Sequence, residues 1–248
     1  QDARDHDDAI YAVKDQNNSG GYIVWVAIAD VAKYVQQNSA LDREALRRGN
    51  STYFPGSVVP MIPDVLSGNM CSLKKGEIRA ALAVKMWINR EGQKTNHCFF
   101  RCTIKNKMAI TYEEAQTALD NSHDQKVTFK CKKLLKPLYE AYKLIEKQSE
   151  ERNPLKLEVA ERQIIFKKNG EVKDIQTKKV LESHKLVEEL MILANICAAE
   201  TIKKNKLSFL YRVHEPPSFE KLFNLNTVVK SLGMNIKIGT RITGQDLN

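Results

Sequence analysis

Four carboxylates stand within the first eight residues of this chain, at Asp2, Asp5, Asp7 and Asp8. The whole sequence of 248 residues carries a formal net charge of +9, so this acidic cluster contrasts with the rest of the chain. Carboxylates this close repel one another, and some stay protonated unless a cation neutralises them. Mg²⁺ prefers carboxylate oxygens, retains several waters and shares its remaining coordination positions with substrate phosphates. The cluster therefore indicates a site for one or two divalent cations that act on a phosphate group.

The apolar run Ala9–Val13, which follows the cluster, predicts a strand. In an extended segment Asp5 and Asp7 point to the same side and Asp8 points to the other, unless a turn redirects it. Three carboxylates on a tight bend that leads into a strand suit hard cations.

Three other interpretations compete with this metal site. A solvated acidic loop is the usual structure of such a segment. An EF-hand is poorly supported. Counted from Asp5, the fifth position is Ala9, which offers no side-chain oxygen, and the twelfth is Gln16 where an EF-hand has Glu. The adjacent pair His6 and Asp7 is also typical of HD-type phosphohydrolases, but these need a helix and further spaced histidines.

The stretch Asp2–Ala9 resembles the acidic motif of the ribonuclease II/R superfamily, whose catalytic unit is the RNB domain. His6 stands where the family commonly has Phe. Further family motifs follow in the same order through nearly the whole chain, and bacterial ribonuclease R is the branch that they resemble most. These motifs are Trp25–Val31, Leu41–Ala45, Thr52–Gly56, Val59–Pro63, Leu66–Ser67, Cys71–Leu73 and Leu186–Asn195.

This resemblance implies an α+β (mixed α/β) fold, with helices packed over a curved, largely antiparallel sheet. It implies a hydrolytic 3′→5′ exoribonuclease that degrades single-stranded RNA to nucleoside 5′-monophosphates with two Mg²⁺ ions. Asp5, Asp7 and Asp8 are the expected metal ligands and catalytic residues, and loss of Asp7 is expected to harm catalysis most.

The resemblance also implies RNA contacts at four positions. Tyr53 would stack on a base near the site, although an aromatic in such a loop often fills the core instead. Tyr112 would contact RNA, or pack at the start of a helix. Leu157 stands where the family often has an aromatic that stacks on the last base, so only apolar packing is expected there. Glu188 would bond a ribose 2′-OH, whereas the structural alternative is that one of Glu188 and Glu189 is exposed and the other is paired.

The family pattern extends beyond both ends of this sequence. A further metal-binding Asp precedes the motif in the family, and a later Ser-Pro-Ile-Arg segment supplies an Arg to the reacting phosphate. Residues 1–248 are therefore expected to form part of an RNB domain, without the flanking cold-shock and S1 modules. One alternative is a catalytically incomplete, RNA-binding fragment. Another is a metal-dependent phosphohydrolase of small nucleotides.

Composition narrows the class of protein. Lys and Arg outnumber Asp and Glu by 39 to 30, which favours a polyanionic partner, although most Lys is expected to lie on solvated helix surfaces. Five scattered cysteines favour reduced thiols and a cytoplasmic location. No apolar run reaches the roughly 18 residues of a membrane span, and no obligate protein partner is evident.

The expected elements follow from periodicity and capping signals. Asp30 is expected to be a buried or capping carboxylate, and Ser51–Pro63 an irregular, rigidly turned loop. The expected strands are Ala9–Val13, Tyr22–Asp30, Ala81–Ile88, His97–Ile104, Gln163–Phe166 and Val172–Gln176. The expected helices are Leu41–Arg48, one starting at Thr111, Lys126–Arg152, Ser183–Lys206 and one from Ser218 to Leu232.

Overall fold

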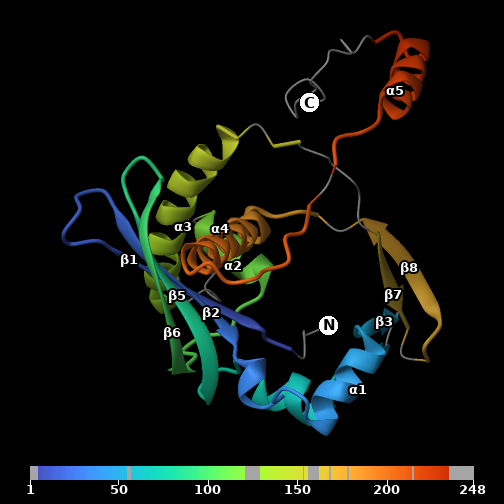
Figure 1. Cartoon of the computed structure of the whole chain (residues 1–248). Coiled ribbons are helices and arrows are strands. Elements are labelled where there is room, and N and C mark those ends of the chain that lie inside the picture. Colours follow the sequence, from blue (N-terminus) through green and yellow to red (C-terminus); the bar gives the residue numbers. More distant parts are fainter. Residues whose placement is uncertain are drawn as a thin grey trace.

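The strands of the main sheet are neighbours through hairpins and one longer connection. The computed structural model describes residues 5–54, 57–120, 129–152, 154–155, 162–167, 169–177, 179–213 and 215–234. Within these residues, one four-stranded antiparallel sheet has the order β1-β2-β5-β6 (Figure 1). Its strands are β1 (Asp8–Lys14), β2 (Tyr22–Ala29), β5 (Ile78–Ile88) and β6 (Lys94–Lys105).

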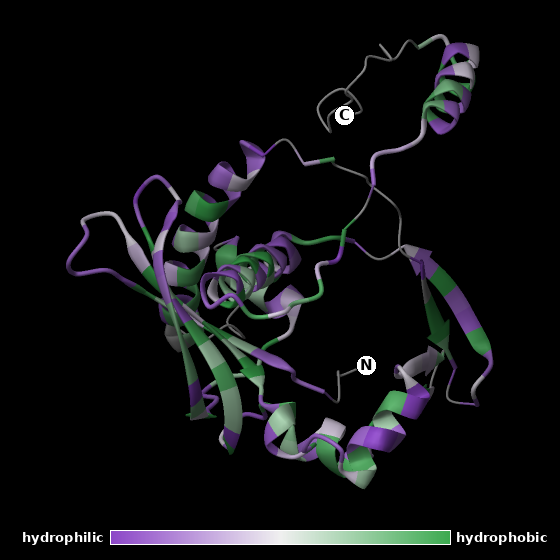
Figure 2. Ribbon diagram, viewed as in Figure 1, coloured by the Kyte–Doolittle hydropathy of each residue, from purple (hydrophilic) through white to green (hydrophobic). Residues whose placement is uncertain are grey.

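Three helices cover one face of this sheet because each presents an apolar side to it. They are α2 (Tyr112–Leu119), α3 (Phe129–Glu150) and α4 (Glu182–Lys204). Val24, Met86, Tyr142 and Leu190 are fully buried between them and the strands. Figure 2 shows the same pattern, with hydrophobic colour on the strands and on the helices beside them, and hydrophilic colour at the hairpin tips. This interface is the main core of the described chain.

The segment between β4 (Ser57–Val59) and β5 covers part of the opposite sheet face. Leu66 and Cys71 pack with Ala27 and Ala83 in a second core, which also contains the fully buried Leu73. The segment includes a short π-helix, η2 (Leu66–Met70), while a 3₁₀ turn, η1 (Val31–Lys33), follows β2. This second core brings residues 71–73 close to the start of β1.

Two helix starts follow the expected capping chemistry. α1 (Ala40–Arg48) begins after Ser39, whose side chain accepts a hydrogen bond from the Asp42 N–H, and ends at Gly49. α2 begins with the capping box that the Thr-x-x-Glu pattern predicts. The expected strands and helices are present among the described residues, although the start of the expected helix Lys126–Arg152 lies outside them, and the antiparallel α+β architecture is confirmed.

The expectation for residues 51–63 was wrong. Residues 51–63 contain a short hairpin, β3 (Thr52–Phe54) paired with β4 (Ser57–Val59), rather than only an irregular loop. Both arms are rich in aromatic and β-branched residues, which favour extended pairing. The prolines of this segment predict a turned loop, but they lie outside both arms of the ladder.

The hairpin of β7 (Arg162–Phe166) and β8 (Val172–Thr177) and the helix α5 (Phe219–Ser231) lie away from the main sheet (Figure 1). Every residue of β8 is exposed. The helix α5 has no buried residue. No helix in the described part of the chain is long and apolar enough to cross a membrane.

Candidate active site

Residues 5–8, called here the acidic segment, lead into β1, and hydrogen bonds to their backbone hold them on both sides. On one side, the Ala29 N–H donates to the carbonyl oxygen of Asp7 (2.9 Å). On the other, the Leu73 N–H donates to the carbonyl oxygen of His6 (2.7 Å), and the His6 N–H donates to Ser72 Oγ (3.0 Å). Ser72 and Leu73 are completely buried. The packed backbone therefore sets the positions of the carboxylates.

Strand alternation separates two of these carboxylates. Ile10 packs in the main core beneath the helices, whereas Ala9 packs in the second core. Side chains two residues apart share a face, so Asp8 lies on the helix-covered side and Asp7 on the other. This agrees with the expectation that Asp8 would point away from Asp7.

The pKa values of Asp7 and Asp8 are both raised in the structure. Burial raises the pKa of Asp7 above its usual value, and the charges of Asp5 and Asp8 raise it further, while His6 lowers it. Burial also raises the pKa of Asp8, against a backbone hydrogen bond and the effect of His6. A divalent cation would favour the ionised forms.

The donor set suits a hard cation in chemistry but supplies only part of a coordination shell. Within the described ranges, no group of three or more His, Cys, Asp or Glu side chains is arranged to hold a metal ion. Water and substrate phosphate oxygens would have to complete the shell, as they do for many Mg²⁺ sites.

Tyr112 is the first residue of α2, and a capping box fixes the start of this helix. Thr111 Oγ accepts a hydrogen bond from the Glu114 N–H (3.1 Å), and the Thr111 N–H donates to Glu114 Oε2 (2.8 Å). The Tyr112 ring is stacked on His184, with 4.0 Å between ring centroids and 18° between planes. Burial raises the pKa of Tyr112, and the charge of Asp8 raises it further. Tyr112 and Asp8 are therefore near enough for the charge of Asp8 to act on the Tyr112 hydroxyl.

The other expected RNA contacts lie elsewhere. Tyr53 is on β3 with 72% of its surface exposed, and Figure 1 shows this strand beyond α1, apart from the main sheet. Leu157 lies outside the described residues. Glu188 is exposed on α4, whereas Glu189 accepts a hydrogen bond from Ser149 Oγ (2.9 Å) and lies 3.7 Å from Arg152. Of the two glutamates, Glu188 is therefore the one that can reach a ligand.

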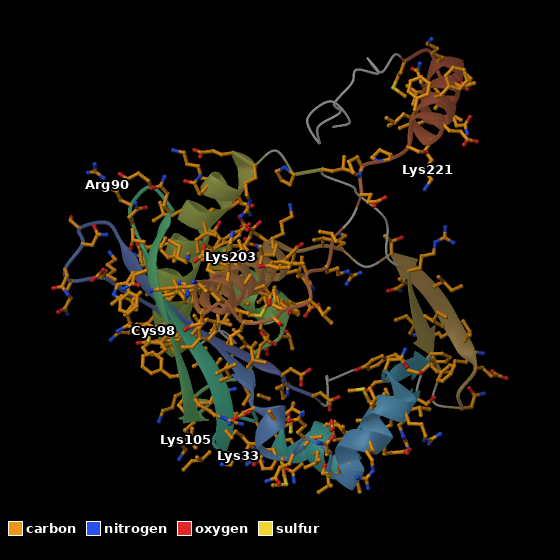
Figure 3. The ribbon with its side chains drawn as sticks, in the orientation of Figure 1. Lys33, Arg90, Cys98, Lys105, Lys203 and Lys221 are labelled. Atoms are coloured by element: carbon orange, nitrogen blue, oxygen red, sulfur yellow. The ribbon has the colours of Figure 1, made fainter. Side chains whose placement is uncertain are left out.

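Basic side chains are spread over the molecule. Figure 3 labels five of them, and they lie on separate elements. The labelled cations are Lys33, Arg90, Lys105, Lys203 and Lys221.

Two contacts near the site could not be read from the sequence. One is the stacking of His184 on Tyr112, and the other is an ion pair at the end of β2. Asp30 is 7% exposed, as expected of a buried carboxylate, and its partner is Arg101, with Nε 2.5 Å from Oδ2 and Nη2 3.0 Å from Oδ1. The only sequence signal was the charge at the end of an apolar strand.

Comparison with known proteins identifies the family. The RNB domain model matches residues 1–247. Ribonuclease R of Escherichia coli is 36% identical over 99% of this chain, and ribonuclease R of Thermotoga maritima is 37% identical over 98%. The chain spans only 30% and 34% of the lengths of these two relatives.

A solved structure agrees with the sequence matches. The structure of Mycoplasma genitalium RNase R in complex with ribose-methylated single-stranded RNA superposes with a TM-score of 0.90 at 29% identity. The match covers 99% of this chain and 38% of that one. The acidic segment, the helix-covered antiparallel sheet and the match over residues 1–247 together show that this chain belongs to the RNB domain family.

Proposed function

We propose that this chain is part of the catalytic domain of a hydrolytic 3′→5′ exoribonuclease, which degrades single-stranded RNA to nucleoside 5′-monophosphates. The observation that carries the proposal is the position of the acidic segment at the edge of an RNB-type sheet. Its backbone accepts hydrogen bonds from the N–H groups of Ala29 and Leu73. The similar M. genitalium enzyme has been solved with single-stranded RNA bound, which supports the substrate class.

We propose that two Mg²⁺ ions are the cations, with Asp5, Asp7 and Asp8 as the protein ligands that they share. RNB nucleases are metal-dependent hydrolases. When bound, the metal would activate water, orient the scissile phosphate and stabilise the leaving 3′-oxygen. The packed backbone of His6 and Asp7 would hold the ligands in place before substrate arrives, which limits the reorganisation needed for catalysis.

The RNA contacts are proposed from exposure and position. Tyr53 is free to stack on a base of any sequence, an interaction worth about 1–3 kcal/mol per base. Tyr112 would contact the nucleotide next to the metal. Glu188 would accept a hydrogen bond from a ribose 2′-OH and so distinguish RNA from DNA. Leu157 remains a proposed packing contact in the residues that the structure does not describe.

We also propose a cytoplasmic location. All five cysteines are free thiols in the structure, which suits a reducing compartment.

A second candidate function is RNA binding without cleavage. It is favoured by the absence, among the described residues, of three or more side chains converging on a metal position. Under this alternative the exposed Tyr53 would still bind RNA, but added Mg²⁺ would have no effect on RNA length.

The decisive experiment is a gel time course with 5′-labelled single-stranded RNA, with and without Mg²⁺. The wild-type chain should produce a shortening ladder that requires Mg²⁺, and Asp7→Asn should abolish it because one anionic ligand is lost. RNA affinity, measured by filter binding, should change by no more than about twofold, since the packed backbone remains. Asp174→Asn, on the exposed strand β8, makes the same chemical change away from the acidic segment and should cleave normally.

The remaining outcomes separate the alternatives. A gel shift without cleavage by the wild-type chain would favour the binding module. Equal loss of cleavage and affinity in Asp7→Asn would make Asp7 structural. Preferential turnover of a small mononucleotide-like phosphodiester over long RNA would favour a nucleotide phosphohydrolase.

A further inference from the structure

The first turns of α2 and α4 are joined through Ser183. Ser183 Oγ donates a hydrogen bond to the carbonyl oxygen of Tyr112 (2.9 Å). The Ser183 N–H donates to Gln116 Oε1 on the next turn of α2 (3.1 Å). Ser183 is only 4% exposed, so both bonds are shielded from water. The backbone of Tyr112 is therefore attached to α4 as well as to its own helix.

The ring of Tyr112 is attached to α4 through His184. The two rings are nearly parallel at a centroid separation of 4.0 Å, so the imidazole covers one face of the phenol. The imidazole is itself oriented, because its Nδ1 accepts a hydrogen bond from the Leu181 N–H (3.1 Å). Tyr112 keeps 42% of its surface exposed. A ligand can therefore reach part of a ring whose plane is already set.

We infer that His184 is a positioning residue for RNA, which holds the Tyr112 ring in the orientation that receives the nucleotide at the reacting end. The inference rests on the proposed function and adds a residue that would act only through Tyr112. Without the imidazole, the exposed ring would sample other side-chain rotamers and pay an ordering cost each time RNA binds.

Two substitutions separate stacking from helix capping. His184→Phe keeps an aromatic ring beneath Tyr112 but removes the acceptor for the Leu181 N–H. His184→Gln keeps an acceptor at the third position of the helix, where Gln is a good capping residue, but removes the ring. If stacking is what matters, the Phe variant retains wild-type RNA affinity and cleavage. The Gln variant then binds RNA roughly 2- to 12-fold more weakly, the range expected for one aromatic pair.

A double-mutant cycle tests whether His184 acts through Tyr112. RNA affinity, KM and kcat are measured for His184→Gln, Tyr112→Ala and the double variant, with unfolding midpoints recorded for each. The inference requires the double variant to bind RNA no more weakly than Tyr112→Ala alone. It also requires the loss in His184→Gln to appear in affinity or KM while the unfolding midpoint is retained.

Each failure has a distinct signature. Additive losses, or a Phe variant as impaired as the Gln variant, would overturn the positioning role and leave the exoribonuclease proposal standing. A wild-type chain that neither binds nor cleaves RNA would overturn the proposed function and this inference with it.

Discussion

The turn between β5 and β6 packs directly against α3 at Gly92, which leads to a quantitative prediction for Gly92→Ala. Gly92 is buried with a φ of +83°. A Cβ there would lie 2.6 Å from the carbonyl carbon of Leu144 and nearer still to its oxygen. Both are backbone atoms within α3, so no flexible side chain can move aside.

The expected cost has two parts. A left-handed backbone at a residue with a Cβ costs about 1–2 kcal/mol. Overpacking against a fixed neighbour adds about 1–3 kcal/mol. Gly92→Ala should therefore lower the free energy of unfolding by roughly 2–5 kcal/mol. Gly76 provides a matched control, because its φ is also +83° but a Cβ added there would meet no other part of the chain within 4 Å. Gly76→Ala should show only the first part.

Urea unfolding followed by circular dichroism would measure both variants, with equal m-values as the check that the unfolding transition is comparable. The turn that contains Gly92 follows the C-terminal end of β5. Asp8 pairs with Ile28 on β2, and Ile28 pairs with Leu82, which lies nearer the other end of β5. Metal-dependent RNA cleavage by folded Gly92→Ala should therefore be unchanged. Equal destabilisation of the two variants, within about 0.5 kcal/mol, would refute the steric argument.

Two further predictions concern the ion pair at β2 and the main core. Hydrogen bonding from Arg101 holds the pKa of Asp30 below its usual value near 3.8, so its stabilising contribution is complete above that pH and is lost as the pH falls through the lower native pKa. Asp30→Asn should therefore be less stable than the wild type at pH 7, with the difference shrinking as acid is added in a urea-unfolding series; a constant difference would contradict the assignment. Leu190→Ala should lower the free energy of unfolding by about 2–5 kcal/mol, because Leu190 is fully buried between α4 and the sheet. Leu46→Ala, at a leucine that is 82% exposed on α1, should change it by less than about 0.5 kcal/mol, and equal effects of the two substitutions would contradict the proposed core.

The local elements were predictable because their signals are local. The Thr111 capping box, the Ser39 cap and the apolar side of α4 depend on residues within a few positions of each other. The same holds for Asp7 and Asp8, whose opposite directions follow from strand alternation alone. The hairpin of β3 and β4 was missed because the prolines nearby outweighed the extended preference of its two arms.

The acidic motif, the order of the elements and the residue types available for metal and RNA can all be read along the chain. Which of these residues meet depends on how the chain packs. His6 is joined to Ser72, Tyr112 to His184 and Asp30 to Arg101, through contacts that span roughly 70 positions in the sequence. No local propensity encodes such contacts, because they form only when the helices and the second core close over the two faces of one sheet.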